Sequence, residues 1–225
     1  MLINLENIKY YFLTYNNETR KQHMLTEFKE YNITAVDSIH EDSKYKSGAI
    51  GFSKILDLAS SIQDNNKPFQ PFVMFEDDVK KYRSFPKTIE IPDDADLFFI
   101  GLSRCGMQHD VWCNTVCYSN VKVNENIIKL HNMLSLHGII ICSARGLLAI
   151  QKCMFESYFK DIIWDIFTAQ IQPFYNVYAL RIPLVYQYGL IGGQEEPTKI
   201  EYTLINKNME DSWINNSHLS VKSCY

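Results

Sequence analysis

Three consecutive carboxylates stand directly after a short apolar run in this chain. The run covers Phe72 to Phe75, and Glu76, Asp77 and Asp78 follow it. Adjacent carboxylates repel one another at neutral pH unless solvent or a cation neutralises them. If the run is a strand of an open α/β sheet, its carboxyl end opens into the ligand crevice, where a divalent ion can lie between protein oxygens and a diphosphate. The motif predicts a metal site, with a solvated acidic turn as the alternative.

A second acidic run contains the pattern Asp-x-Asp. It covers Asp93, Asp94 and Asp96, and it precedes the apolar segment Leu97 to Gly101. Residues that precede a strand lie at the opposite edge of a parallel sheet from residues that follow one. Because Pro92 stands just before the run, we expect a Pro-Asp turn with a solvated face rather than a metal site.

Cysteine and histidine recur every four residues at Cys105, His109, Cys113 and Cys117. On a helix, this spacing would place four possible zinc ligands on one face. However, the segment from Val111 to Val123 is rich in β-formers, and the two-residue gap of a zinc knuckle is absent. The cysteines are therefore interpreted mainly as buried thiols, with a zinc site as the alternative.

The surrounding pattern indicates which elements position these residues. Strands are expected over residues 8–15, 33–36, 71–75, 97–101, 111–123, 127–133 and 137–142, and helices over 18–31, 48–63, 144–158 and 161–172. Alternation of strands and helices in the first part predicts an α/β fold with a mostly parallel, Rossmann-like central sheet flanked by helices on both faces. A mixed part follows toward the C-terminus.

Length and charge narrow the class of protein. A chain of 225 residues with 46% apolar and 21% charged residues is expected to form a single domain. The net charge is −4 and no basic run appears, so nucleic acid is not the expected partner. No signal peptide is recognised, and no apolar stretch has the roughly 18 residues of a membrane span, so a cytoplasmic protein is expected.

Several segments resemble, in their order, those of glycosyltransferase family 25, the lipooligosaccharide-type and collagen-type sugar transferases. The segments are Tyr11 to Tyr15 with Arg20, Gly48 to Ser53, Phe75 to Val79, Asp96 to Gly101, Ser143 to Leu147, Trp164 to Phe167, and Pro183 to Gln187. The likeness runs from Ile8 to about Thr203. It implies a GT-A-like fold in which about residues 1–110 bind a nucleotide-sugar, about 111–205 face the acceptor, and 206–225 form a tail.

The resemblance also implies an activity. It implies an inverting glycosyltransferase that uses Mn²⁺ or Mg²⁺ and a nucleotide-sugar donor, with a UDP-sugar favoured over a GDP-sugar, and a glycan or protein hydroxyl as acceptor. Asp78 is the expected direct metal ligand, with Glu76 beside it, and Glu76 and Asp77 belong to the donor motif. Asp165 matches the acidic residue of the family that would serve as general base. These roles suit the chemistry, because a carboxylate can take the proton of an attacking hydroxyl.

Further donor-site candidates lie near the first strand and the second helix. Arg20 is expected to meet the diphosphate, and Tyr15 to stack on the base, with an exposed arginine and a packed aromatic as the alternatives. The remaining donor-site candidates are Leu13, Thr14, Gly48, Lys54 and His137. Thr14, Tyr15 and Lys54 depart from the residues usual in the family, and a structural role is the alternative for His137. The segment around Gly192 and Gly193 is interpreted as a flap over the donor.

The sequence is also compatible with two other functions. A nucleotidyltransferase would also combine an α/β sheet with acidic metal ligands, but it would need a glycine-rich loop after the first strand, and the segment from Leu13 to Arg20 contains no glycine. A non-catalytic nucleotide-sugar-binding module is the third hypothesis. The presence of all three carboxylates at 76–78 and of Asp165 favours an enzyme.

Overall fold

The computed structural model describes residues 1–64, 66–103, 107–108, 111–112 and 119–188. Four α-helices occur in these ranges: α1 (Glu18–Glu27), α2 (Lys44–Ser61), α3 (Ala144–Lys160) and α4 (Trp164–Ile171), followed by the 3-10 helix η1 (Gln172–Phe174). The strands of the main sheet are β2 (Lys9–Thr14), β3 (Ile33–Asp37), β4 (Phe72–Phe75), β7 (Leu97–Phe99), β10 (Ser119–Lys122), β11 (Ile127–His131), β12 (Ile139–Ile141) and β13 (Val177–Leu180). Three two-stranded sheets pair β1 (Leu2–Asn4) with β6 (Thr88–Glu90), β5 (Val79–Lys81) with β14 (Val185–Gln187), and β8 (Met107–Gln108) with β9 (Val111–Trp112).

The main sheet is mixed, so the prediction of a mostly parallel, Rossmann-like core was wrong. Its strand order is β10-β11-β13-β7-β12-β4-β2-β3. Strand β2 pairs in parallel with both β3 and β4, and β13 pairs in parallel with β7. The other four neighbouring pairs are antiparallel, because β12 runs against β4 and β7, and β11 runs against β10 and β13.

The physical reason for the mixed sheet lies in the segment between α2 and α3. Parallel neighbours need crossover connections, which are usually helices. The described residues between α2 and α3 form no helix, so nothing there imposes a parallel arrangement. Strand β12 consists of three buried isoleucines. A strand that is apolar on both faces suits either direction.

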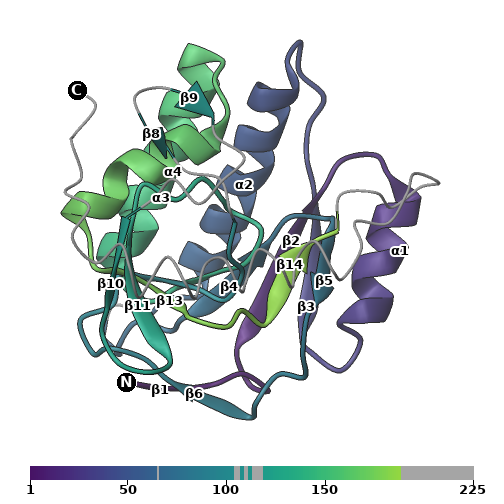
Figure 1. Ribbon diagram of the computed structural model, residues 1–225. Coiled ribbons are helices and arrows are strands. Elements are labelled where there is room, and N and C mark those ends of the chain that lie inside the picture. Colours follow the sequence, from purple (N-terminus) through teal and green to yellow (C-terminus); the bar gives the residue numbers. More distant parts are fainter. Residues whose placement is uncertain (65, 104–106, 109–110, 113–118, 189–225) are drawn as a thin grey trace.

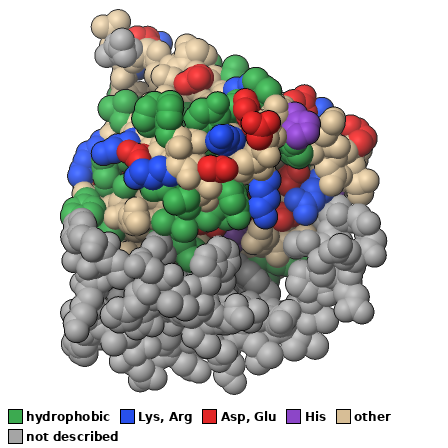
Figure 2. Space-filling model, turned by 90° about the horizontal axis from the view of Figure 1, so that it is seen from above, with side chains coloured by type: hydrophobic (Ala, Val, Ile, Leu, Met, Phe, Trp, Pro, Cys, Tyr) green, Lys and Arg blue, Asp and Glu red, His purple; other side chains and the backbone are tan. Residues whose placement is uncertain are grey.

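The parallel part of the sheet creates the edge at which the site lies. Strands β2, β3 and β4 end at this edge, and helices α1 and α2 begin there (Figure 1). Each helix starts at a polar cap, because the side chain of Asn17 accepts from the backbone N–H of Arg20 and that of Ser43 accepts from the N–H of Tyr45. Figure 2 looks down on this edge and shows acidic and basic side chains mixed together.

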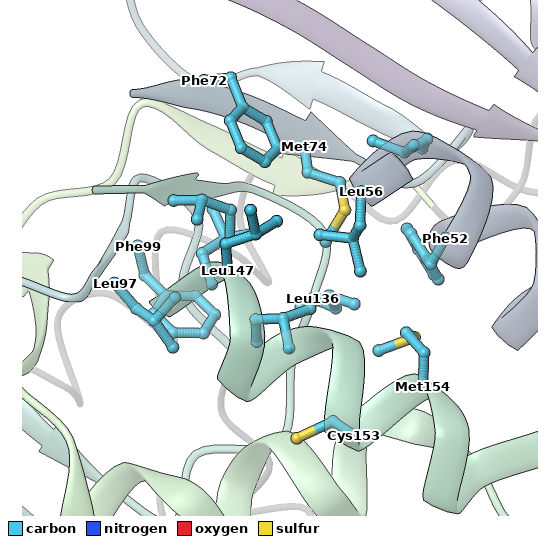
Figure 3. Packing of buried hydrophobic residues seen from close by; sticks show 14 of the residues in the cluster. Phe52, Leu56, Phe72, Met74, Leu97, Phe99, Leu136, Leu147, Cys153 and Met154 are labelled. Carbon is cyan, nitrogen blue, oxygen red and sulfur yellow. The ribbon is translucent and has the colours of Figure 1, made fainter. Parts of the chain in front are cut away.

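Apolar side chains fill both faces of the sheet. On one face, Phe52 and Leu56 of α2 and Leu147 and Met154 of α3 pack against Met74 and its neighbours (Figure 3). On the other face, Met24 of α1 and Phe28, which directly follows this helix, pack against the opposite sides of β2, β4 and β7. Both faces of the sheet are therefore part of the apolar core.

Most of the predicted elements are present with shifted ends. Helix α2 begins at Lys44, four residues before the predicted start, because Ser43 caps it. Helix α1 ends at Glu27 rather than at Tyr31. Among the described helices, none is long and apolar enough to cross a bilayer.

Candidate functional site

A cavity of about 330 Å³ lies at the carboxyl ends of β2 and β4. Its lining comes from β2 and the following loop, from the starts of α1, α2 and α4, from the loop after β4, and from β14. The lining residues are Leu13, Tyr15, Asn17, Arg20, Ser38, Lys44, Ser47, Gly48, Glu76, Asp77, Asp78, Trp164 and Gln187. The acidic motif predicted from sequence therefore opens into a cavity rather than forming a solvated turn.

Arg20 holds two of the three carboxylates of this motif. Its Nη1 donates to Asp77 Oδ1 at 2.8 Å and lies 3.6 Å from Asp78 Oδ2. Asn17, as the cap of α1, places Arg20 in the first turn of that helix, beside the end of β4. Asp78 is buried, and burial raises the pKa of its carboxyl although the charge of Arg20 lowers it.

Asp165 brings a fourth carboxylate to the same place. It lies in the first turn of α4, and its Oδ1 is buried although the residue as a whole is only half-buried. Burial, and then the charge of Asp78, raise the pKa of Asp165 to about 7. Burial and the charge of Asp165 likewise raise the pKa of Glu76 well above its usual range. The carboxylates of residues 76–78 and of Asp165 are far apart in sequence but interact electrostatically in the folded chain.

Gln187 also reaches these carboxylates, and sequence reasoning gave it no role. Strand β14 pairs antiparallel with β5, which follows the acidic motif. Gln187 Nε2 is thereby placed 3.4 Å from Glu76 Oε2 and 3.3 Å from Asp78 Oδ2. The only signal in the sequence was that Gln187 ends one of the segments shared with the sugar transferases.

The wall of the cavity formed by α2 is positive. Lys44 is the first residue of this helix and is exposed, and Ser47 and Gly48 line the cavity one turn further on. A helix N-terminus attracts anions, whereas a lysine there opposes the helix dipole. A bound anion would offset the positive charge of Lys44 at the N-terminus of α2. Lys44 was also missed from sequence.

A second cavity, of about 430 Å³, adjoins the first and shares Tyr15, Asn17 and Ser38 with it. Asp37 at the end of β3 and His40 line it, together with Thr14, Asn16, Glu18 and Lys21. Tyr15 Oη and His40 Nδ1 lie 2.9 Å apart. We call these two adjoining cavities, along the ends of β2 and β3, the recess.

Most of the predicted site residues meet in this recess. Leu13, Tyr15, Arg20, Gly48 and the three carboxylates line the first cavity, and Thr14 lines the second. Two predicted donor-site residues lie elsewhere. Lys54 lines neither cavity, and its Nζ donates to the backbone oxygen of Asp37 at 3.0 Å. His137 is buried, with Nδ1 2.8 Å from Ser135 Oγ, and burial lowers the pKa of its imidazole to about 4.

The second acidic run differs from its prediction at one residue. Asp93 and Asp94 are exposed, as expected of a turn. Asp96 is buried, however, and accepts hydrogen bonds from Ser143 Oγ at 2.7 Å and from Arg145 Nη1 at 2.9 Å. Its role is to tie the start of α3 to the start of β7, so the prediction of a solvated carboxylate was wrong for Asp96.

Other predictions lie outside the described residues. These are the four spaced Cys and His residues from 105 to 117, the segment around Gly192 and Gly193, and the tail 206–225. Cys142 and Cys153 are described, and both are buried free thiols, as predicted.

The recess suits a cation in part. No three Asp, Glu, His or Cys side chains of the described residues are arranged as a complete metal site. On the other hand, Asp78 Oδ1 and Asp165 Oδ1 are buried and have no hydrogen-bond partner among the described residues. Mg²⁺ usually binds through one or two carboxylates and completes its shell with water and phosphate oxygens. Asp78 and its neighbours fit an ion held in that way.

Comparison with known proteins finds a similar structure but no similar sequence. No protein-family model matches the chain, and no curated protein matches it significantly in sequence. The crystal structure of A197 from STIV is similar with a TM-score of 0.44 at 10% sequence identity, over 86% of this chain and 91% of A197.

Proposed function

We propose that this protein is a divalent-metal-dependent glycosyltransferase. It would move a sugar from a nucleotide-sugar, with a UDP-sugar favoured, to a hydroxyl of a glycan or protein, with inversion at the anomeric carbon. One observation carries the proposal. The carboxylates of residues 76–78 line a cavity together with Arg20 and Lys44, and Asp165, beside the lining residue Trp164, lies close enough to interact electrostatically with Glu76 and Asp78.

The recess offers a place for each part of a nucleotide-sugar donor. The second cavity, with Tyr15 and Asp37, has room for a nucleoside. The diphosphate would lie in the first cavity, near Lys44 and the N-terminus of α2, which stabilise the negative charge that develops on it. Asp78, with Glu76, would hold the divalent ion, which as a Lewis acid stabilises the leaving diphosphate.

Asp165 is suited to accept a proton from the attacking hydroxyl. A general base works best when its pKa is close to the working pH, and burial raises the pKa of Asp165 to about 7. The proton passes from the hydroxyl to a carboxylate oxygen of Asp165 while the hydroxyl oxygen attacks the anomeric carbon opposite the diphosphate. Arg20, paired with Asp77, keeps the acidic loop in place.

A donor-hydrolysis screen tests the proposal without knowledge of the acceptor. The full chain is incubated with UDP-, GDP- and dTDP-sugars, each with Mn²⁺ and with a chelator, and release of the nucleoside diphosphate is measured. We expect Mn²⁺-dependent hydrolysis of one donor, and its loss in Asp78→Ala. Donor binding by thermal shift without hydrolysis would instead support a non-catalytic module, and pyrophosphate release from a nucleoside triphosphate and a sugar phosphate would support a nucleotidyltransferase.

A further inference from the structure

Helix α1 contacts the backbone that directly follows the acidic motif. The helix packs beside β5 (Figure 1), and His23 and Glu27, four residues apart, lie on one side of it. His23 Nε2 lies 3.0 Å from the backbone oxygen of Val79, and the backbone N–H of Lys81 donates to Glu27 Oε1 at 2.9 Å. A carbonyl oxygen can only accept, so His23 Nε2 carries a proton and donates it. These two contacts tie the backbone of β5 to α1.

Strand β14 contacts the same backbone. The backbone N–H of Tyr188 donates to the carbonyl oxygen of Asp78, and Gln187 is the partner of Val79 in the antiparallel pairing of β14 with β5. The ring of Tyr188 stacks on the imidazole of His23, with the ring centroids 5.8 Å apart and 22° between the planes. His23 therefore binds the carbonyl of Val79 and packs on the residue that binds the carbonyl of Asp78.

We propose that His23 is a positioning residue for the carboxylate of Asp78. The inference rests on the proposed function, in which Asp78 is a ligand of the divalent ion. Tyr188 holds the carbonyl group of Asp78, and His23 holds that of the next residue, Val79. With both carbonyl groups held, the backbone at Asp78 has little freedom to rotate, so its carboxylate stays 3.6 Å from Arg20 Nη1. A ligand that is already in place loses less freedom when it binds.

A purely structural role, in attaching α1 to the sheet, is the alternative for His23. Met24 and Phe28 are fully buried and pack the helix and the residues just after it onto the sheet. His23 is only half-buried, so it contributes little of the apolar burial that attaches α1. Its hydrogen bond is instead directed at the residue next to Asp78. The proposal therefore predicts that loss of this bond affects metal affinity more than stability.

Two variants separate the hydrogen bond of His23 from its ring. His23→Phe keeps a ring beside Tyr188 and removes the donor. His23→Gln removes the ring and keeps an N–H donor of similar reach. Gln22→Ala, at an exposed position of the same helix, is the matched control.

The affinity of the full chain for Mn²⁺ is measured by titration calorimetry, alone and with UDP, GDP or dTDP. We expect His23→Phe to bind Mn²⁺ roughly 10-fold more weakly than the parent, at the lower end of the effects of outer contacts of metal ligands, because His23 acts through the backbone. His23→Gln and Gln22→Ala should bind within about threefold of the parent. The melting temperature of His23→Phe should fall by no more than about 2–4 °C, as for the loss of one hydrogen bond.

Hydrogen exchange of the metal-free proteins tests the positioning without the ion. Peptides that cover residues 76–81 should exchange faster in His23→Phe than in the parent, because one of the contacts that hold this backbone is lost. The same peptides should exchange at nearly the parent rate in His23→Gln. Peptides that cover β12 should be unchanged in both variants.

Three results would overturn the proposal. The first is a folded His23→Phe variant with the Mn²⁺ affinity and hydrogen exchange of the parent; if the parent binds Mn²⁺ and Asp78→Ala does not, the metal site stands without a role for His23. The second is an equal loss of affinity in His23→Phe and His23→Gln, which would assign the effect to packing. The third is a parent chain that binds no Mn²⁺ under any of these conditions, which would overturn the proposed metal site and this inference with it.

Discussion

Asp165→Asn should stabilise the metal-free protein at pH 8 but hardly at pH 4.5. Burial and the charge of Asp78 raise the pKa of Asp165 in the folded state to about 7, whereas an aspartate in an unfolded chain has a pKa of about 3.9. The folded state therefore holds this proton more tightly than the unfolded state does. For a raised carboxyl pKa, stability is highest below the unfolded pKa and is lost as pH rises toward the folded pKa.

The size of the effect follows from that difference. A difference of roughly three pKa units corresponds to about 4 kcal/mol of destabilisation above pH 7. Asparagine has a similar shape and no charge, so it removes this penalty. The charge of Asp165 also raises the pKa of Glu76, so the substitution affects Glu76 as well. We expect a gain of about 2–4 kcal/mol at pH 8. At pH 4.5 the gain should fall to about 1 kcal/mol or less.

Urea denaturation with a chelator present measures this gain. The free energy of unfolding of parent and variant is compared at both pH values, so that pH effects common to the two proteins cancel. Asp57→Asn, at an exposed position of α2, is the matched control and should change stability by a few tenths of a kcal/mol at either pH. A gain of equal size at the two pH values, or a loss of stability at pH 8, would refute the reasoning.

The remaining predictions concern the site and its packing. Asp165→Asn should bind nucleotide-sugar and Mn²⁺ as the parent does but transfer about 10²- to 10⁴-fold more slowly, and retained transfer with lost donor affinity would contradict its role as base. Asp78→Ala should remove the Mn²⁺-stimulated part of donor binding, measured by titration calorimetry, and unchanged stimulation in a folded variant would contradict the metal assignment. Asp94→Asn should leave turnover within a few-fold of the parent, since an exposed residue at the opposite edge touches no reacting charge; loss of metal binding would show that the wrong acidic run was chosen. Gly48→Ala should lower the free energy of unfolding by about 1–3 kcal/mol, because its Cβ would lie 2.1 Å from the ring of Trp164; an unchanged urea midpoint would contradict this.

Local signals in the sequence predicted the elements better than their arrangement. Apolar periodicity located α1 and α2, Ser143 as a cap located α3, and the short run before Glu76 was recognised as a buried strand. Strand direction was not predictable in the same way. The three isoleucines of β12 are buried from both sides, so neither alternation nor polarity distinguished its antiparallel pairing with β4 and β7 from a parallel one.

Site residues that form a recognisable chemical pattern were predictable from the sequence. Site residues that only the packing of the fold brings to the recess were not. Three adjacent carboxylates after a strand identified the acidic wall from sequence alone. Lys44 and Gln187 carry no such signal, because a lysine in a helix and a glutamine in a strand are common. They reach the recess only because Ser43 starts α2 early and because β14 pairs with β5.

Gly48 shows how packing places a catalytic candidate. Sequence reasoning assigned this glycine to the donor site, and it does line the cavity. Its missing side chain also has a second consequence, since the ring of Trp164 occupies the space where a Cβ would lie. The same indole packs edge-on against Phe52, one turn along α2. Trp164 thereby fixes the start of α4 against α2, and the next residue, Asp165, is held within reach of Glu76 and Asp78. Gly48 in α2 therefore contributes to the position of Asp165, the proposed base, in the first turn of α4.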